Sequence, residues 1–119
     1  MGATLINVFI VPRERETEFL EQWRKTAAHF ADGKGLLETH LHRNTGMGNE
    51  SFSFVNIARW TSAEAWHSSH DAFPPGEYRI PGVKGHPAIF ETCVNVYSGE
   101  ADRSTADGHW IASVTTSAA

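Results

Sequence analysis

The stretch of residues 51–60 most constrains how this 119-residue chain can fold. Its aromatic residues alternate with other side chains, as the period of two in a β-strand requires. One face of the predicted strand carries Phe52, Phe54, Asn56, Ala58 and Trp60. An amide buried among aromatic rings costs free energy unless it finds hydrogen-bond partners. The pattern therefore predicts a strand whose inner face either buries a bonded Asn56 in the core or lines a pocket for a flat, partly polar ligand.

A helix is predicted to follow this strand directly. Thr61 with Glu64 three residues later forms a capping-box pattern, typical of a helix start. The expected helix runs from Ser62 to about Phe73 and places Trp66 and His70 on one side.

The remaining elements follow from hydrophobic periodicity. Strands are expected at Thr4–Val11, Leu36–Arg43 and Pro87–Tyr97, an amphipathic helix at Arg13–Asp32, and an irregular lid-like segment at residues 74–85. The element order β-α-β-β-α-β predicts a ferredoxin-like α+β fold, with one antiparallel sheet and both helices on one face. A second copy of the chain would cover the other face.

The chain is expected to form one domain over residues 1–98. From residue 99 to residue 119 the composition changes to Gly, Ser, Thr, Ala and Asp. This tail is expected to be partly flexible or to pack on a partner chain, and residues 109–114 are a candidate for a short strand.

Composition excludes several classes of function. Ten basic and fourteen acidic residues give a net charge of −4 without a basic cluster, so no nucleic-acid partner is expected. No apolar run is long enough for a membrane span. The single cysteine excludes an intrachain disulfide and suits a reducing, cytoplasmic location.

Two strands carry further polar candidates. Asn7 and Phe9 lie on one face of the first strand, with Asn7 again a lone amide in an apolar run. His40 and His42 share a face of the second strand and are candidate general bases, because imidazole titrates near neutral pH. The pair resembles part of a cupin metal site, but no glutamate follows at the required spacing, so no metal site is expected.

With these features, the chain resembles the antibiotic biosynthesis monooxygenase family from about Leu5 to Val96. The segments that carry the resemblance are Ile6-Asn-Val-Phe9, Leu41-His-Arg43, Phe54-Val-Asn-Ile-Ala-Arg-Trp60, Ser62-Ala-Glu-Ala-Trp66 and His86-Pro-Ala-Ile-Phe90. The resemblance implies a dimeric α/β-barrel built from two ferredoxin-like protomers.

The resemblance also implies site residues. Cofactor-independent oxygenases of aromatic polyketides in this family carry an Asn-x-x-x-Trp spacing, which falls on Asn56 and Trp60. A tyrosine and an arginine line their pockets, with Tyr78 and Arg79 as counterparts by location alone. Heme-degrading relatives have an axial histidine on or after the second helix, the region of His70 and His86, and an asparagine that matches Asn7. The tryptophan of those enzymes is not matched.

The resulting hypothesis is a monooxygenase that oxidises an aromatic, polyketide-like anthrone or phenol to a quinone. Molecular oxygen is the co-substrate and no cofactor is expected, although heme or reduced flavin stays an alternative. The pocket would lie between the sheet and the second helix. Asn56 and Trp60 would stabilise the substrate oxyanion, and His40 or His42 would take the proton. The expected substrate-binding residues are Asn7, Phe9, Phe52, Phe54, Trp66, His70, Tyr78, Arg79 and His86. Alternatives are a cyclase or isomerase, a heme-degrading enzyme, and a non-catalytic ligand-binding dimer.

Overall fold

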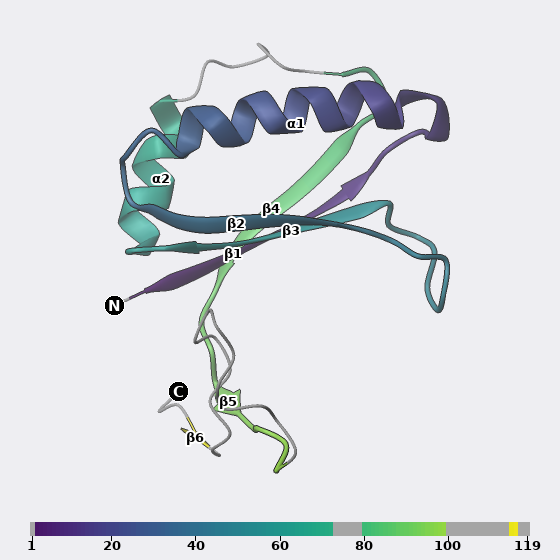
Figure 1. Cartoon of the computed structure of the whole chain (residues 1–119). Coiled ribbons are helices and arrows are strands. Elements are labelled where there is room, and N and C mark those ends of the chain that lie inside the picture. Colours follow the sequence, from purple (N-terminus) through teal and green to yellow (C-terminus); the bar gives the residue numbers. More distant parts are fainter. Residues whose placement is uncertain (1, 73–79, 100–114, 117–119) are drawn as a thin grey trace.

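The computed structural model describes residues 2–72, 80–99 and 115–116 (Figure 1). Its strands are β1 (Ala3–Ile10), β2 (Leu36–Arg43), β3 (Phe54–Trp60), β4 (Lys84–Phe90), β5 (Val94–Asn95) and β6 (Thr115–Thr116). Its helices are the short 3₁₀ turn η1 (Arg13–Arg15), α1 (Glu16–Phe30) and α2 (Ala63–Ala72).

The first four strands form one antiparallel sheet in the order β2-β3-β1-β4. The strand that carries Asn56 is therefore central, and Asn56 lies directly opposite Asn7 across the β1–β3 ladder. This order and the two helices confirm the ferredoxin-like α+β fold predicted from the element sequence.

Both helices pack on one face of the sheet, and the buried residues there form two clusters. At one end, Phe19 of α1 packs between Phe9 and Phe54, with ring centroids 5.0 Å apart in both pairs. At the other end, Ala65 and Trp66 of α2 pack against a buried cluster that includes Trp60. The aromatic face of β3 is thus turned toward the helices along its whole length.

The junction between β3 and α2 differs by one residue from the sequence prediction. Ser62, and not Thr61, caps α2, because its hydroxyl oxygen accepts a hydrogen bond from the Ala65 amide. The Thr61 amide instead donates to the carbonyl oxygen of Gly35. Gly35 has φ +114°, and a side chain there would bring its Cβ within 2.7 Å of the Ala65 Cβ. Glycine therefore lets the turn before β2 approach α2 closely.

The last strand of the main sheet is displaced from its predicted bounds. It begins at Lys84, inside the segment expected to be irregular, and ends at Phe90 rather than at Tyr97. Phe90 pairs with Thr4, and β1 begins only one residue before Thr4, so residues after Phe90 have no partner strand there. Beyond this point, β5 pairs with β6. The candidate strand at residues 109–114 lies outside the described residues.

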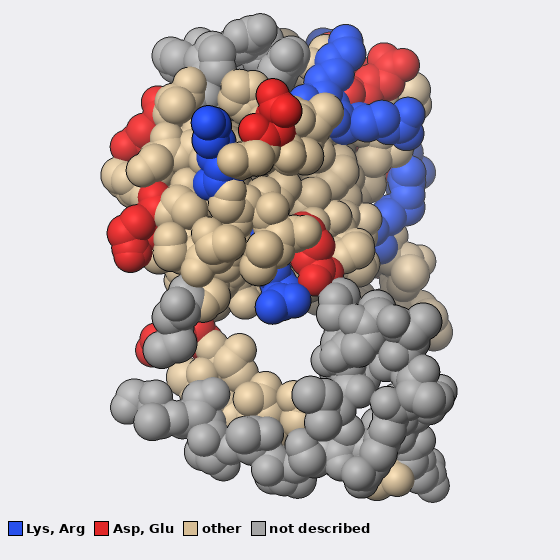
Figure 2. Space-filling model, turned by 60° about the vertical axis from the view of Figure 1, so that its left-hand side comes forward, with Lys and Arg blue, Asp and Glu red and all other residues tan. Residues whose placement is uncertain are grey.

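The sheet face opposite the helices is partly apolar and exposed. Ile10, Ile57 and Phe90 are each more than a third exposed. Figure 1 shows the chain after β4 running away from the sheet on the side opposite α1. Charged side chains are scattered around a broad uncharged area on the surface seen in Figure 2, with most Lys and Arg along one edge. Within the described residues, no helix is long and apolar enough to cross a membrane.

Candidate functional site

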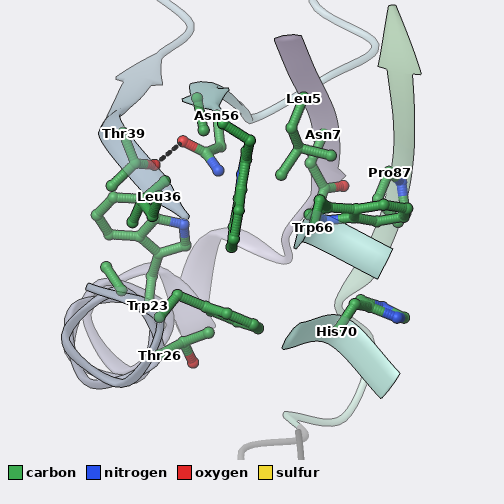
Figure 3. A pocket seen from close by; sticks show the side chains of 14 residues that line it. Leu5, Asn7, Trp23, Thr26, Leu36, Thr39, Asn56, Trp66, His70 and Pro87 are labelled. Atoms are coloured by element: carbon green, nitrogen blue, oxygen red, sulfur yellow. Dashed lines mark hydrogen bonds between the residues drawn. The ribbon is translucent and has the colours of Figure 1, made fainter. Parts of the chain in front are cut away.

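A cavity of about 110 Å³ lies between the sheet and the two helices (Figure 3). All four strands of the main sheet and both α-helices contribute to it. Its lining consists of Leu5, Asn7, Trp23, Thr26, Ala27, Phe30, Leu36, Thr39, Asn56, Ala58, Trp60, Trp66, His70 and Pro87. The lining is mostly aromatic and aliphatic with a few polar groups, which is the composition typical of small-molecule sites.

Asn56 lies at the centre of this cavity wall and is only 8% exposed. Its Oδ1 accepts a hydrogen bond of 2.6 Å from the Thr39 hydroxyl on the neighbouring strand. Figure 3 shows the Asn56 oxygen facing Thr39, with the amide nitrogen on the other side of the group, toward the cavity. The hydrogen bond from Thr39 thus offsets part of the free energy cost of burying the Asn56 amide. The N–H groups of Asn56 are available to a ligand.

Asn7 supplies a second amide from β1. Its Oδ1 accepts a hydrogen bond of 2.8 Å from the backbone amide of His86 on β4. A Cβ at Gly85 would lie 3.2 Å from this oxygen, so the glycine leaves room for the amide. The Asn7 side chain therefore has a fixed oxygen and a nitrogen left to donate.

Trp60 lines the same cavity and is 2% exposed. Its indole Nε1 is buried and has no hydrogen-bond partner among the described residues. The ring packs edge-on against Phe30 of α1, with centroids 6.0 Å apart. A buried donor without a partner is costly, so a ligand acceptor at this position would recover free energy.

Trp66 and His70 reach the cavity from α2, one helical turn apart. Their ring centroids are 5.1 Å apart at a tilt of 33°. His70 keeps a side chain that is 53% exposed, and its Nδ1 lies 3.9 Å from a carboxylate oxygen of Asp71. Among the described residues that line the cavity, His70 is the only one with an acid or base side chain.

Three aromatic residues expected to bind substrate lie elsewhere. Phe9 and Phe54 belong to the core cluster around Phe19, at the far end of the same sheet face. Phe52 precedes β3 and is 45% exposed, because the strand begins only at Phe54. The structure therefore places none of the three in the cavity lining.

The other predicted histidines are on the wrong side of the sheet for this cavity. In the β2–β3 ladder, Thr39 lies opposite Ala58 of the cavity wall, whereas His40 lies opposite Ile57 of the other face. His40 contacts Glu38 there at 2.9 Å, and its ring is 6.5 Å from that of His42. His86 pairs with Val8, so its side chain also turns away, and only its backbone amide contributes through Asn7.

Tyr78 and Arg79 lie outside the described residues. Other lining residues were not singled out by the sequence. Trp23 and Phe30 lie in the segment predicted as an amphipathic helix, and Thr39 lies on the predicted strand that carries His40 and His42. The signal for Thr39 was available, because a hydroxyl on the inner face of a neighbouring strand is a natural partner for a buried amide.

No group of three or more potential metal ligands occurs within the described parts of the chain. A heme would require His70 as its axial ligand. The cavity volume of about 110 Å³ is well below the roughly 300 Å³ at the lower end for drug-sized ligands. The cavity enclosed by the described residues is therefore smaller than a heme.

The fold and this cavity define a small ferredoxin-like protein with an apolar, donor-lined pocket. A family model described as antibiotic biosynthesis monooxygenase matches residues 3–73. The chain belongs to this family, as the resemblance of its motifs implied. A comparison with curated proteins gave no significant match.

Solved structures agree with the family. A monooxygenase candidate from Shewanella loihica PV-4 is 28% identical, with a TM-score of 0.67, covering 76% of this chain and 93% of that protein. SnoaB, a cofactor-independent oxygenase from Streptomyces nogalater, is 26% identical, with a TM-score of 0.62 and coverage of 76% and 92%. The heme-degrading MhuD from Mycobacterium tuberculosis, in a structure with two hemes bound, is similar in fold, at 22% identity, a TM-score of 0.61 and coverage of 79% and 98%.

Proposed function

We propose that the chain is a monooxygenase that oxidises an aromatic, polyketide-like anthrone or phenol with molecular oxygen and without a metal or organic cofactor. The observation that carries the proposal is that one aromatic cavity holds both the Asn56 amide and the indole N–H of Trp60, which has no hydrogen-bond partner among the described residues. Both are donors that can stabilise an oxyanion in a site of low dielectric constant. The similarity to the cofactor-independent oxygenase SnoaB supports this choice.

In the proposed reaction the substrate supplies the electrons. A base removes a proton from the anthrone, and Asn56 and Trp60 stabilise the resulting oxyanion. The anion passes one electron to dioxygen, the two radicals combine to a peroxide anion, and the protonated base returns its proton to give a hydroperoxide. Loss of one water molecule then leaves the quinone, so that the CH₂ group and O₂ become C=O and H₂O.

His70 is the base in this proposal, in place of His40 or His42. It lines the cavity, whereas the other two project from the opposite sheet face. In this arrangement the carbonyl oxygen of the anthrone lies near Asn56 and Trp60, and its CH₂ carbon lies near His70. Proton transfer by a positioned histidine contributes roughly 10²–10⁴-fold to the rate.

A second copy of the chain is proposed to cover the exposed sheet face. The apolar residues Ile10, Ile57 and Phe90 lie on that face, and solved structures of similar fold include a dimeric ferredoxin-like protein. An Ile57→Lys variant should halve the mass measured by light scattering. An unchanged mass for the variant, or a monomeric wild type, contradicts this arrangement.

The test of function combines a spectrum with oxygen uptake. Purified protein should be colourless and should consume oxygen with dithranol, an anthrone, whether or not a chelator is present. A Soret band or chelator-sensitive uptake overturns the cofactor-free mechanism. Conversion of substrate without oxygen consumption would instead indicate a cyclase or isomerase that uses the same oxyanion, and binding without conversion would indicate a ligand-binding dimer.

A further inference from the structure

The two amides of the cavity are oriented by groups outside it. The Asn7 oxygen faces the backbone N–H of His86, and a peptide N–H can only donate. The oxygen of Asn7 must therefore face β4, as Figure 3 shows, and its NH₂ group is the part left to a ligand.

The orientation of Asn56 depends on Thr39. A hydroxyl can donate or accept, so the chemistry of Thr39 alone does not fix which end of the amide it meets. The separation of 2.6 Å lies within the range of O–H···O bonds and below the range of roughly 2.7–3.2 Å for N–H···O bonds. The oxygen of Asn56 is thus the atom bonded to Thr39, and its NH₂ group remains for the cavity.

The rest of the lining offers mainly donors. The indole of Trp60 has only an N–H to give, and it has no partner in the described structure. The Thr26 hydroxyl is an exception, because it donates its hydrogen to the Gln22 carbonyl of its own helix and keeps only an acceptor oxygen. No carboxylate is among the described lining residues. A ligand with an acceptor oxygen therefore matches this wall, and one without such an oxygen leaves its donors unpaired.

We infer that Thr39 is a positioning residue that makes the cavity select aromatic ligands through an acceptor oxygen, either a carbonyl or a phenolate. The Thr39 hydroxyl keeps the Asn56 oxygen away from the ligand and so presents the NH₂ group. This inference adds to the proposed function the ligand group that is recognised, an acceptor oxygen. It rests on the proposed function only where it predicts an effect of Thr39 on turnover.

Loss of the hydroxyl has a defined consequence. Without it, the buried oxygen of Asn56 lacks its donor, and rotation of the amide brings that oxygen into the cavity. An acceptor oxygen of the ligand would then meet another acceptor instead of a donor. Recognition of the oxygen weakens, while contact with the apolar ring system does not change.

The experiment compares two flat probes with the same three-ring system, anthraquinone with carbonyl oxygens and anthracene without them. Quenching of tryptophan fluorescence reports binding, because Trp23, Trp60 and Trp66 line the cavity. The variants are Thr39→Val, which keeps the shape and removes the hydroxyl, and Thr39→Ser, which keeps the hydroxyl. Circular dichroism and thermal unfolding check that each variant is folded.

Wild-type protein should bind anthraquinone about tenfold or more tightly than anthracene, as expected for one or two additional hydrogen bonds. Thr39→Val should lower this preference roughly five- to tenfold and leave anthracene affinity unchanged. Thr39→Ser should retain the preference. For turnover of dithranol, Thr39→Val should lower kcat about tenfold or more with a smaller change in KM, since the lost donor acts mainly on the oxyanion.

Three results overturn the inference: equal binding of both probes by the wild type, an unchanged preference in Thr39→Val, or a loss in Thr39→Ser equal to that in Thr39→Val. The two proposals fail separately. A Thr39-dependent preference without oxygen uptake would reject the oxygenase and keep the inference, whereas oxygen uptake with no Thr39-dependent preference would do the reverse.

Discussion

Successive residues of one strand point to opposite faces of the central sheet, and the two faces differ in burial and in polar contacts. On the helix side, Asn56 is buried, bonded to Thr39 and surrounded by aromatic side chains of the cavity. On the other side, Ile57 and His40 lie opposite each other and are exposed. Because side chains alternate along a strand, a shift of one residue decides whether a group belongs to the cavity or to the outer surface.

This difference shows that residue type alone does not identify a catalytic group. His40, His42 and His70 have the same chemistry, but only His70 lines the cavity. The helix-side face is itself divided, with a closed core around Phe19 at one end and the cavity near Trp60 at the other. Each prediction below tests one of these differences between parts of the sheet.

The largest expected effect comes from the two histidine positions. His70→Ala should lower the rate of dithranol-dependent oxygen uptake by roughly 10²–10⁴-fold, because it removes the proposed base. His40→Ala should leave the rate within about twofold, since it removes only an exposed contact with Glu38. Initial rates at saturating substrate measure both, and the opposite ranking would move the site to the other face.

The next effect separates the closed core from the exposed segment just before β3. Phe54→Ala should destabilise the fold by about 3–5 kcal/mol, because Phe54 is 2% exposed and packs on Phe19. Phe52→Ala, two residues earlier and largely exposed, should cost less than about 1 kcal/mol. Urea unfolding gives both values, and similar losses would contradict the assignment of Phe54 to the core.

The smallest effect tests the unpartnered indole of the cavity. Trp60→Phe keeps an aromatic ring and removes a buried N–H that has no partner in the described structure. We expect oxygen uptake to fall about five- to tenfold, the value of roughly one hydrogen bond. The free energy of unfolding should change by less than about 1.5 kcal/mol, since loss of packing is offset by removal of the unpaired donor. A large loss of stability with unchanged uptake would mean that Trp60 is purely structural.

The fold was predictable because periodicity identifies strands and helices independently of their packing. The bounds of β2 were predicted to the residue, and the face that Asn56 shares with Trp60 is the one buried in the structure. The position of Ser62 as the cap and the end of β4 at Phe90 were not, since they depend on the Gly35 contact and on where β1 begins. These are tertiary constraints that local patterns do not contain.

The site was predictable only in part. Alternation shows which residues of one strand share a face, but it does not show which residues of the neighbouring strand lie beside them. Alternation placed Thr39 on the β2 face opposite His40 and His42, as in the structure, but a register shift between Leu36 and Glu38 puts Leu36 in the cavity lining and leaves Leu37 exposed. The register that places Thr39 beside Ala58, and His40 beside Ile57, is set by the connection between β2 and β3. The contribution of Trp23 likewise depends on how α1 lies over the sheet. Asn56 and Trp60 line the cavity as the motif indicated, but their partner Thr39 required the three-dimensional register.

The most direct test of the central claim, that the helix-side cavity is an oxygenase site, is oxygen uptake with dithranol by wild-type protein and by Asn56→Ala, both in the presence of chelator. The wild type should consume oxygen, and the variant should do so roughly 10²–10³-fold more slowly, as expected for loss of an oxyanion donor. Circular dichroism and binding of anthracene confirm that the variant keeps its fold and its apolar cavity. Equal rates in the two proteins, or no uptake by the wild type, would contradict the claim.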